Sequence, residues 1–282
     1  MTINEFIEKW SPAVKENLPD EDARLILEIL ICDILEIPFQ YGNLNGSIEI
    51  SNSDSSILSK GVKKVIEGVP VQYVTGISWF LGLKFKINRH VLIPRPETEE
   101  LIDYILIKES DSKTPVIIDF GCGSGCIPVS VAKFLPGSKV YAIDISAPAL
   151  ELTTENALLN GVELNIINMD ILAGIPAMDE KIDIIISNPP YIEPDEKSQI
   201  DMNVLDNEPH LALFTPVGNP LIFYRQILQF ASQSLSDTGS IYFEMNPHYV
   251  DELTKLTREM GYKQIEFKED ITGKLRFCII GR

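Results

Sequence analysis

Residues 116–125 read Val-Ile-Ile-Asp-Phe-Gly-Cys-Gly-Ser-Gly, and this stretch predicts a buried strand that runs into a tight turn. A continuous apolar run is typical of a strand that is covered on both faces. Glycines allow backbone angles that other residues avoid, and they let the main chain approach a ligand closely. Residues 127–135 predict a helix directly after the turn. A strand, a glycine-rich turn and a helix in this order indicate a nucleotide-binding α/β fold.

The alternation of strands and helices continues toward the C-terminus. Residues 140–144, 164–167 and 182–187 are further predicted strands, and residues 148–160 form a predicted helix. Their apolar runs favour a parallel sheet covered by helices. Residues 262–267 and 275–280 are strands joined by so short a link that they must pair antiparallel. We therefore predict an α/β domain over residues 95–282, with a helix that begins at Pro96.

The N-terminal part of the chain has a different pattern. Apolar residues recur at helical spacing over residues 25–35, and a second short helix is predicted over residues 57–67. We predict a small helical domain over residues 1–70. Alternating apolar residues at 79–87, a turn at Asn88-Arg89 and a returning strand at 91–93 predict a β-hairpin, so residues 71–94 are interpreted as a hairpin linker.

Composition limits the classes of partner. The chain has 282 residues, 45% hydrophobic residues and a formal net charge of −17. We find no basic cluster of the kind that binds nucleic acid, so direct nucleic-acid binding is not expected. The first ten residues do not resemble a signal peptide, and no apolar stretch is long enough to span a membrane. Four scattered cysteines do not form a disulfide framework, which favours a cytoplasmic location.

The turn predicts a cofactor site. Gly121, Gly123 and Gly125 follow the spacing Gly-x-Gly-x-Gly, whereas a dinucleotide fingerprint needs Gly or Ala at position 126, which is Cys126. Asp144 ends the next strand, where a carboxylate can accept hydrogen bonds from both ribose hydroxyls. This pattern favours S-adenosylmethionine. A nicotinamide cofactor and a purely structural turn remain as alternatives.

A second motif follows the strand at 182–187 and reads Asn188-Pro189-Pro190-Tyr191. Ligands of parallel α/β sheets bind beyond the carboxyl ends of the strands, so this motif should face the cofactor. The prolines remove two N–H donors, which leaves the Asn188 side-chain oxygen and the Pro189 carbonyl as acceptors for an NH2 group. Tyr191 offers an aromatic wall for a planar group. A rigid surface turn is the alternative interpretation.

Methyl transfer to such a nitrogen is consistent with these residue types. An amide nitrogen is a poor nucleophile because its lone pair is delocalised, as the rotation barrier of about 18–20 kcal/mol shows. Alignment of nitrogen and methyl group can supply roughly 7–11 kcal/mol. A sulfonium is already an activated leaving group, so we expect no metal. We interpret the three histidines as structural.

Five motifs together carry a resemblance to a known family. They are residues 71–76 (Val-Gln-Tyr-Val-Thr-Gly), residues 92–99 (Leu-Ile-Pro-Arg-Pro-Glu-Thr-Glu), residues 119–125, residues 188–191, and Glu208-Pro209 with Ala212-Leu213. The chain resembles the peptide chain release factor N(5)-glutamine methyltransferases, the PrmC/HemK family. The resemblance covers residues 70–282 by motif and the helical N-terminal part by architecture.

The resemblance implies a seven-stranded, Rossmann-like methyltransferase domain and an N-terminal helical domain that helps bind the substrate. That substrate is the glutamine of the Gly-Gly-Gln motif in class I release factors. The implied catalytic residues are Asn188, Pro189 and Tyr191, and the implied glutamine-binding residues are Asn188, Pro189, Pro190 and Tyr191. The implied cofactor-binding residues are Gly121, Cys122, Gly123, Ser124, Gly125, Asp144, Ile171 and Asn188.

Some roles and alternatives stay open. Arg95 and Glu97 either close over the methionine end of the cofactor or form a structural pair. The alternative activities are glutamine methylation of a ribosomal protein and N6-methylation of adenine in nucleic acid. The first is disfavoured because that group lacks the Pro96-Glu97-Thr98 form, and the second because of the net charge of −17.

Overall fold

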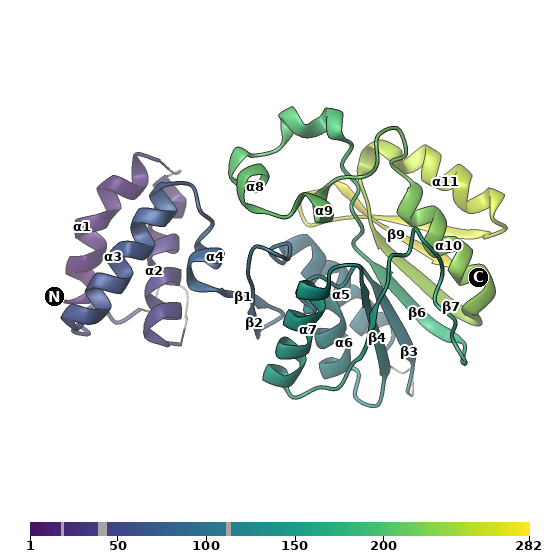
Figure 1. Ribbon diagram of the computed structural model, residues 1–282, viewed down its shortest axis with the longest axis horizontal. Coiled ribbons are helices and arrows are strands. Elements are labelled where there is room, and N and C mark those ends of the chain that lie inside the picture. The colour runs from purple at the N-terminus through teal and green to yellow at the C-terminus, as the bar shows by residue number, and fades with distance from the viewer. Residues whose placement is uncertain (18–19, 39–43, 111–113) are drawn as a thin grey trace. The chain divides into compact units, whose positions relative to one another are not determined.

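A computed structural model of the chain describes residues 1–17, 20–38, 44–110 and 114–282, without the side chains of residues 20–22. It divides into two compact units, Met1–Ile77 and Ser78–Arg282 (Figure 1). Among the residues that it describes, no helix is long and apolar enough to cross a membrane. The functional division at residues 70 and 94 stays a prediction.

The first unit is helical. Its helices are α1 (Ile3–Lys15), α2 (Asp20–Leu35), α3 (Asn52–Ile66) and α4 (Val71–Thr75). The sequence did not predict α1 or α4. Thr2 begins α1 with a reciprocal capping box to Glu5, and the Ser51 side chain caps α3. Apolar residues of all four helices form one core, which includes Phe6, Leu27 and Leu58.

The second unit is built on a seven-stranded sheet of order β5-β4-β3-β6-β7-β9-β8. The strands are β3 (Val116–Phe120), β4 (Lys139–Asp144), β5 (Asn165–Asn168), β6 (Ile182–Ser187), β7 (Leu235–Glu244), β8 (Gln264–Glu269) and β9 (Leu275–Gly281). The first five pair in parallel, and β9 pairs antiparallel with both β7 and β8. The mainly parallel α/β fold with an antiparallel end is therefore confirmed.

Helices cover both faces of this sheet, as the continuous apolar runs predicted. One face packs on α5 (Pro96–Lys108), α6 (Cys126–Phe134) and α7 (Ala147–Asn160), and the other on α10 (Ile222–Ser234) and α11 (Val250–Glu259) (Figure 1). Neighbouring strand residues serve opposite faces: Ile117 lies in one core and Ile118 in the other. Burial on both faces is the physical reason for a strand without polar residues in alternation.

A β-hairpin forms, but it is not the predicted one: its turn lies inside the predicted strand at 79–87 instead of at Asn88-Arg89, and residues 91–93 form no strand. The strands are β1 (Ile77–Phe80) and β2 (Leu83–Lys86). The chain turns at Leu81 and Gly82, which both have positive φ (48° and 71°). Two successive positive φ values match the right-handed twist of a two-residue hairpin, so the glycine fixes the turn earlier than the apolar alternation suggested.

A long excursion of residues 188–221 leaves the sheet after β6 and returns at α10. It contains the 3-10 helix η1 (Pro194–Gln199), α8 (Met202–Asn207) and α9 (His210–Leu213), and a second 3-10 helix η2 (Pro247–Tyr249) follows β7. The sequence did not predict these elements or β7. The excursion matters for function because it contributes one wall of the cavity described next.

Candidate active site

A cavity of about 540 Å³ lies in the second unit, where β3, β4 and β6 end. Of the residues predicted as a site, those that line it are Gly121, Cys122, Gly123, Ser124, Asp144, Ile171, Asn188, Pro189 and Pro190. Gly125 and Tyr191 are not among the lining residues. The glycine turn and the Asn-Pro-Pro motif, 63 residues apart between Gly125 and Asn188, thus meet at one cavity because parallel strands end at the same edge.

The glycines of the turn have two different tasks. Gly121 and Gly123 have positive φ (78° and 53°), and a Cβ on either would meet open space. Gly125, also at positive φ, would place a Cβ 2.8 Å from the Thr153 side chain. The first two therefore leave room on the cavity side, whereas Gly125 allows α6 to begin close to α7.

Two carboxylates lie close to the glycine turn, and only that of Asp144 lines the cavity. Asp144 accepts hydrogen bonds from the Gly123 N–H and the Ser146 N–H, both at 2.9 Å. Asp119 is fully buried, and neither of its oxygens has a hydrogen-bond partner among the described residues. Burial first and the charge of Asp144 second raise the pKa of Asp119 well above its usual range. Burial also raises the pKa of Asp144, although the backbone donors oppose this shift.

These residues fit S-adenosylmethionine. The open space beside Gly121 and Gly123 admits a ligand close to the main chain. Asp144 lines the cavity and is held by two backbone donors, so its carboxylate is placed to accept hydrogen bonds from the ribose hydroxyls of the cofactor. Ile171 lines the cavity with an aliphatic side chain beyond the end of β5.

The motif from Asn188 to Tyr191, called the acceptor motif below, is attached to the sheet and to α5. The Ser187 hydroxyl donates to the Phe120 carbonyl at 2.7 Å, which joins the ends of β6 and β3. The Asn188 Nδ2 atom donates to Thr98 Oγ1 at 3.2 Å, and Thr98 Oγ1 donates to Glu244 Oε2 at 2.7 Å. Thr98 and Glu244 are both buried. Among the described residues, no hydrogen bond is made by the Asn188 side-chain oxygen.

Tyr191 turns toward Glu244 rather than into the cavity. Its hydroxyl donates to Glu244 Oε1 at 3.2 Å. Burial, followed by the negative charge of Glu244, raises the pKa of Tyr191 above its usual range. The phenol therefore stays a hydrogen-bond donor to the buried carboxylate. Its use as an aromatic wall for the acceptor stays a prediction.

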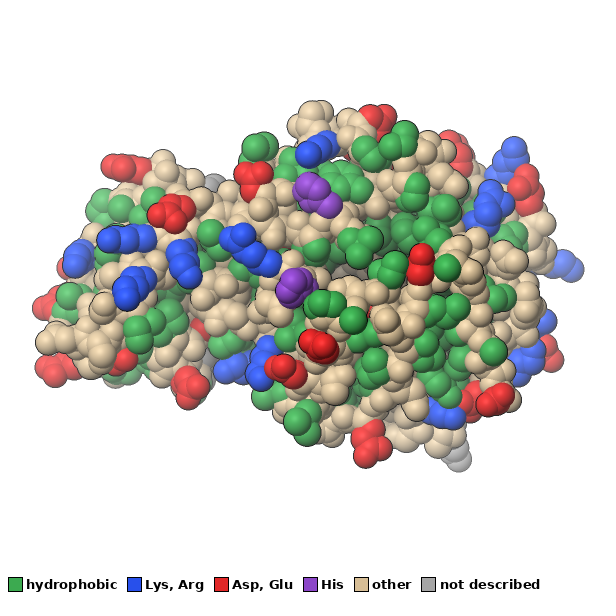
Figure 2. Space-filling model, viewed as in Figure 1, with side chains coloured by type: hydrophobic (Ala, Val, Ile, Leu, Met, Phe, Trp, Pro, Cys, Tyr) green, Lys and Arg blue, Asp and Glu red, His purple; other side chains and the backbone are tan. Residues whose placement is uncertain are grey.

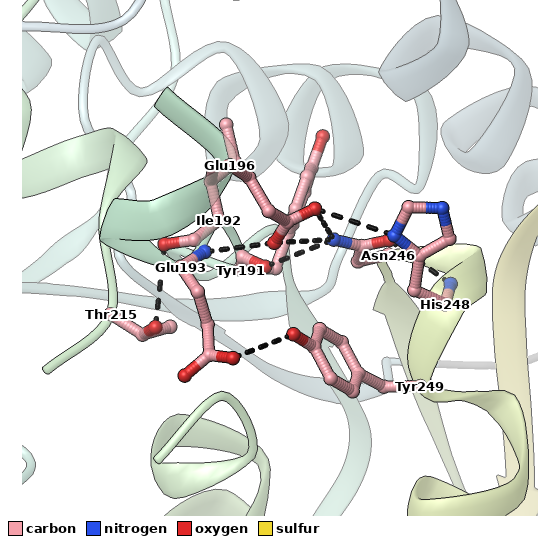
Figure 3. A network of polar contacts seen from close by, with 8 residues as sticks. All are labelled: Tyr191, Ile192, Glu193, Glu196, Thr215, Asn246, His248 and Tyr249. Atoms are coloured by element: carbon pink, nitrogen blue, oxygen red, sulfur yellow. Dashed lines mark hydrogen bonds and ion pairs between the residues drawn. The ribbon is translucent and has the colours of Figure 1, made fainter. Parts of the chain in front are cut away.

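A polar network supports the motif from behind (Figure 3). The Asn246 side chain donates to the Tyr191 carbonyl at 3.4 Å and to Glu196 at 3.1 Å. Further contacts hold the segment after Tyr191: His248 with Glu196 at 3.4 Å, Tyr249 with Glu193 at 2.8 Å and Thr215 with the Ile192 carbonyl at 3.3 Å. The segment at the end of β7 thereby fixes the main chain that follows the prolines.

Glu208 has a role that the sequence did not reveal. Arg95 Nη2 donates to Glu208 Oε1 at 2.6 Å, and the Ile93 N–H donates to Glu208 Oε2 at 3.2 Å. This partly buried ion pair joins the segment before α5 to the excursion that forms the cavity wall. Arg95 lines the cavity and its partner is Glu208. Glu208 and Arg95 both lie in motifs of the resemblance, but 113 residues separate them.

The surface of the second unit does not gather positive charge on the face seen in Figure 2. There, Lys and Arg side chains over the sheet unit are interspersed with Asp and Glu. This part of the visible face therefore shows no basic patch of the kind that binds nucleic acid. This observation agrees with the net charge of −17.

Comparisons with known proteins identify the family. A family model described as "Methyltransferase small domain" matches residues 102–211. The release factor glutamine methyltransferase of Flavobacterium psychrophilum is 44% identical over 213 residues, which cover 74% of each chain. That of Bacteroides thetaiotaomicron is 33% identical over 270 residues, which cover 96% of each chain.

Among solved structures, the catalytic domain of hMettl16 in complex with a MAT2A 3′UTR hairpin has a TM-score of 0.56 and 15% identity, over 99% of this chain and 90% of that chain. A likeness at this identity shows the fold alone. The sequence relatives carry the assignment, because they align along most of both chains. The chain belongs to the release factor glutamine methyltransferase family.

Proposed function

We propose that the protein transfers a methyl group from S-adenosylmethionine to the side-chain amide nitrogen of the glutamine in the Gly-Gly-Gln motif of class I release factors. One observation supports this most strongly: Asn188, Pro189 and Pro190 line the same cavity as the glycine turn and Asp144. A donor beside the turn and an amide beside the prolines would then share one cavity.

The residues of the acceptor motif bind and orient the amide. The Asn188 side-chain oxygen and the Pro189 carbonyl each accept one hydrogen of the NH2 group, which aims the nitrogen at the methyl carbon. S-adenosylmethionine supplies that methyl group in activated form. Orientation contributes roughly 7–11 kcal/mol. Positive charge grows on the nitrogen as its bond to the methyl carbon forms and the carbon–sulfur bond breaks, and the two oxygens stabilise this charge. S-adenosylhomocysteine leaves with the electron pair of that bond, and the nitrogen loses one proton to water.

Methylation of a release factor tests the activity. The protein is incubated with methyl-labelled S-adenosylmethionine and a class I release factor, and peptides are sequenced by mass spectrometry. We expect one methyl group on the glutamine of Gly-Gly-Gln. Gln→Ala in the factor should abolish labelling. Absence of transfer, or transfer that survives this substitution, would contradict the proposal.

The same reaction with nucleic acid tests the alternative chemistry. Duplex DNA and structured RNA replace the release factor at moderate salt, with adenine N6-methylation as the readout. We expect none, because a net charge of −17 does not favour binding to a polyanion. Methylated adenine together with an unmodified release factor would favour the alternative.

We further propose that residues 1–70 help bind the release factor and that residues 71–94 join them to the methyltransferase domain over residues 95–282. Amide hydrogen exchange of the full chain tests this, because a docked partner slows exchange at its contact surface. Added release factor should protect amides within α1–α3. Protection confined to the second unit would contradict a binding role for the helices.

A further inference from the structure

A buried carboxylate connects two members of the acceptor motif. Glu244 ends β7 and is 2% exposed. It accepts hydrogen bonds from the Thr98 hydroxyl at 2.7 Å and from the Tyr191 hydroxyl at 3.2 Å. Thr98 in turn accepts from Asn188 Nδ2 at 3.2 Å. A chain of hydrogen bonds therefore runs from Glu244 through Thr98 to the cavity.

The charge of Glu244 determines which atom donates in each of these hydrogen bonds. An ionised carboxylate has no proton to donate, so Thr98 must use its single hydroxyl proton on Glu244. The Thr98 oxygen can then only accept, and the only donor of the Asn188 side chain is its NH2 group. The two ends of an amide have nearly the same shape, so packing alone does not choose between them. The hydrogen-bond direction makes that choice.

We propose that Thr98 and Glu244 are positioning residues that fix the Asn188 amide with its oxygen toward the acceptor nitrogen. The inference deepens the proposed function and rests on it. In the opposite orientation Asn188 would present NH2 to the NH2 of the substrate, and an acceptor would be replaced by a donor. The acceptor nitrogen would then lose one of the two bonds that aim it.

The surroundings of Glu244 make the direction dependent on pH. Burial raises the pKa of Glu244, while the Thr98 and Tyr191 donors and Arg276 of β9 oppose the shift and Glu97 of α5 adds to it. The Tyr224 hydroxyl donates to the main-chain carbonyl of Glu244 at 3.0 Å. Once protonated, Glu244 can donate to Thr98, and Thr98 is free to donate to Asn188. Turnover should therefore fall as pH decreases through the raised pKa.

Two substitutions at Thr98 form a matched pair. Thr98→Val removes the hydroxyl at nearly constant shape, and Thr98→Ser keeps it. With the whole protein and saturating cofactor, we expect Thr98→Val to lower kcat about 10- to 100-fold, which is less than the roughly 100- to 1,000-fold loss of a whole oriented group, because Asn188 is still present. The KM for S-adenosylmethionine should change less than about threefold, because the lost interaction acts on the acceptor side. Thr98→Ser should recover most of the wild-type kcat.

Glu244→Gln provides the readout that a merely structural residue would not move. A glutamine does not titrate, so the acid-side dependence of kcat should disappear. The Thr98 pair alone decides the question if this variant does not fold. Wild-type kcat in Thr98→Val, or equal losses in the valine and serine variants, would overturn the proposal.

A substrate-free measurement separates this inference from the proposed function. In the cofactor-bound protein, NMR of the Asn188 side chain should show one slowly exchanging NH2 proton in the wild type and in Thr98→Ser, but not in Thr98→Val. Wild-type transfer to the release factor tests the function, and the protected proton tests the positioning. The same exchange rate in all three proteins would overturn the positioning role.

Discussion

The cofactor end and the acceptor end of the cavity are built from contacts of different range. At the cofactor end, Asp144 binds the Gly123 N–H across 21 residues, within one strand-turn-helix-strand unit. At the acceptor end, Asn188 depends on Thr98 across 90 residues, and Thr98 depends on Glu244 across 146 residues. The contacts at the cofactor end join residues that are close in sequence. The contacts at the acceptor end form only after the sheet and α5 have assembled.

The two ends should therefore fail differently when they are altered. Changes at the acceptor end should lower turnover while cofactor binding persists, and changes at the cofactor end should do the reverse. A variant that affected both to the same degree would remove the distinction between them.

The largest effect is expected at Asn188. Asn188→Ala should lower kcat at least about 100-fold, because an oriented acceptor is lost in the transition state. The cofactor Kd, measured by calorimetry, should change much less. Asn203→Ala is the matched control, since Asn203 is exposed on α8 and does not line the cavity. A near-normal kcat in Asn188→Ala would show that Asn188 does not orient the acceptor.

Asp144→Ala should act mainly on the cofactor. Loss of a charge-assisted hydrogen bond of about 1.5–3 kcal/mol should raise the Kd about 10- to 100-fold. At saturating cofactor, kcat should stay within about threefold of the wild-type value, since the acceptor motif is intact. Asp237→Ala serves as the control because the Asp237 side chain is almost fully exposed. An unchanged Kd would show that Asp144 does not bind the cofactor.

Asp119→Asn tests the buried charge through stability. A carboxyl whose pKa is raised on folding stabilises the folded state below its unfolded pKa of 3.8, and this stability is lost as pH rises through the folded pKa. The asparagine amide does not titrate. The free energy of unfolding of the variant should therefore rise relative to that of the wild type between pH 5 and pH 8. We expect about 1–3 kcal/mol at pH 8, the usual cost of an unsatisfied buried group.

Urea unfolding of both proteins at pH 5 and pH 8 measures this difference. A stability difference that does not depend on pH would mean that Asp119 is not the titrating group.

The smallest effect is expected for Tyr191→Phe. Its hydroxyl binds Glu244 and its ring does not line the cavity. Loss of the hydroxyl leaves Thr98 as a donor to the same carboxylate, so kcat should fall less than about tenfold, or about 1.4 kcal/mol. Steady-state kinetics on the release factor measure it. A loss as large as that of Asn188→Ala would mean that the tyrosine contacts the substrate directly.

The difference in contact range also explains how much the sequence could predict. β3, the glycine turn, β4 and β6 were predicted because their apolar runs and glycines act locally. β7 was missed because it carries the polar run Ser236-Asp237-Thr238-Gly239-Ser240 before its apolar residues. The hairpin turn was misplaced because alternation continued past Gly82, whose positive φ determines the turn.

The same limit applies to the site. The lining positions from Gly121 to Ser124, Asp144 and Asn188 to Pro190 follow from motifs at strand ends. The roles of Thr98, Glu244 and Glu208 did not, because each depends on a partner about 90 to 150 residues away that spacing does not reveal. The orientation of the Tyr191 side chain could not be predicted either, since its hydroxyl binds Glu244, 53 residues away.

A crystal structure with S-adenosylhomocysteine and a peptide that contains Gly-Gly-Gln is the most direct measurement. Asn188 Oδ1 and the Pro189 carbonyl should each lie about 2.6–3.2 Å from the glutamine amide nitrogen, with that nitrogen facing the cofactor sulfur. Thr98 should still accept from Asn188 Nδ2. A glutamine whose carbonyl oxygen faces Asn188, or whose nitrogen points away from the sulfur, would contradict the account.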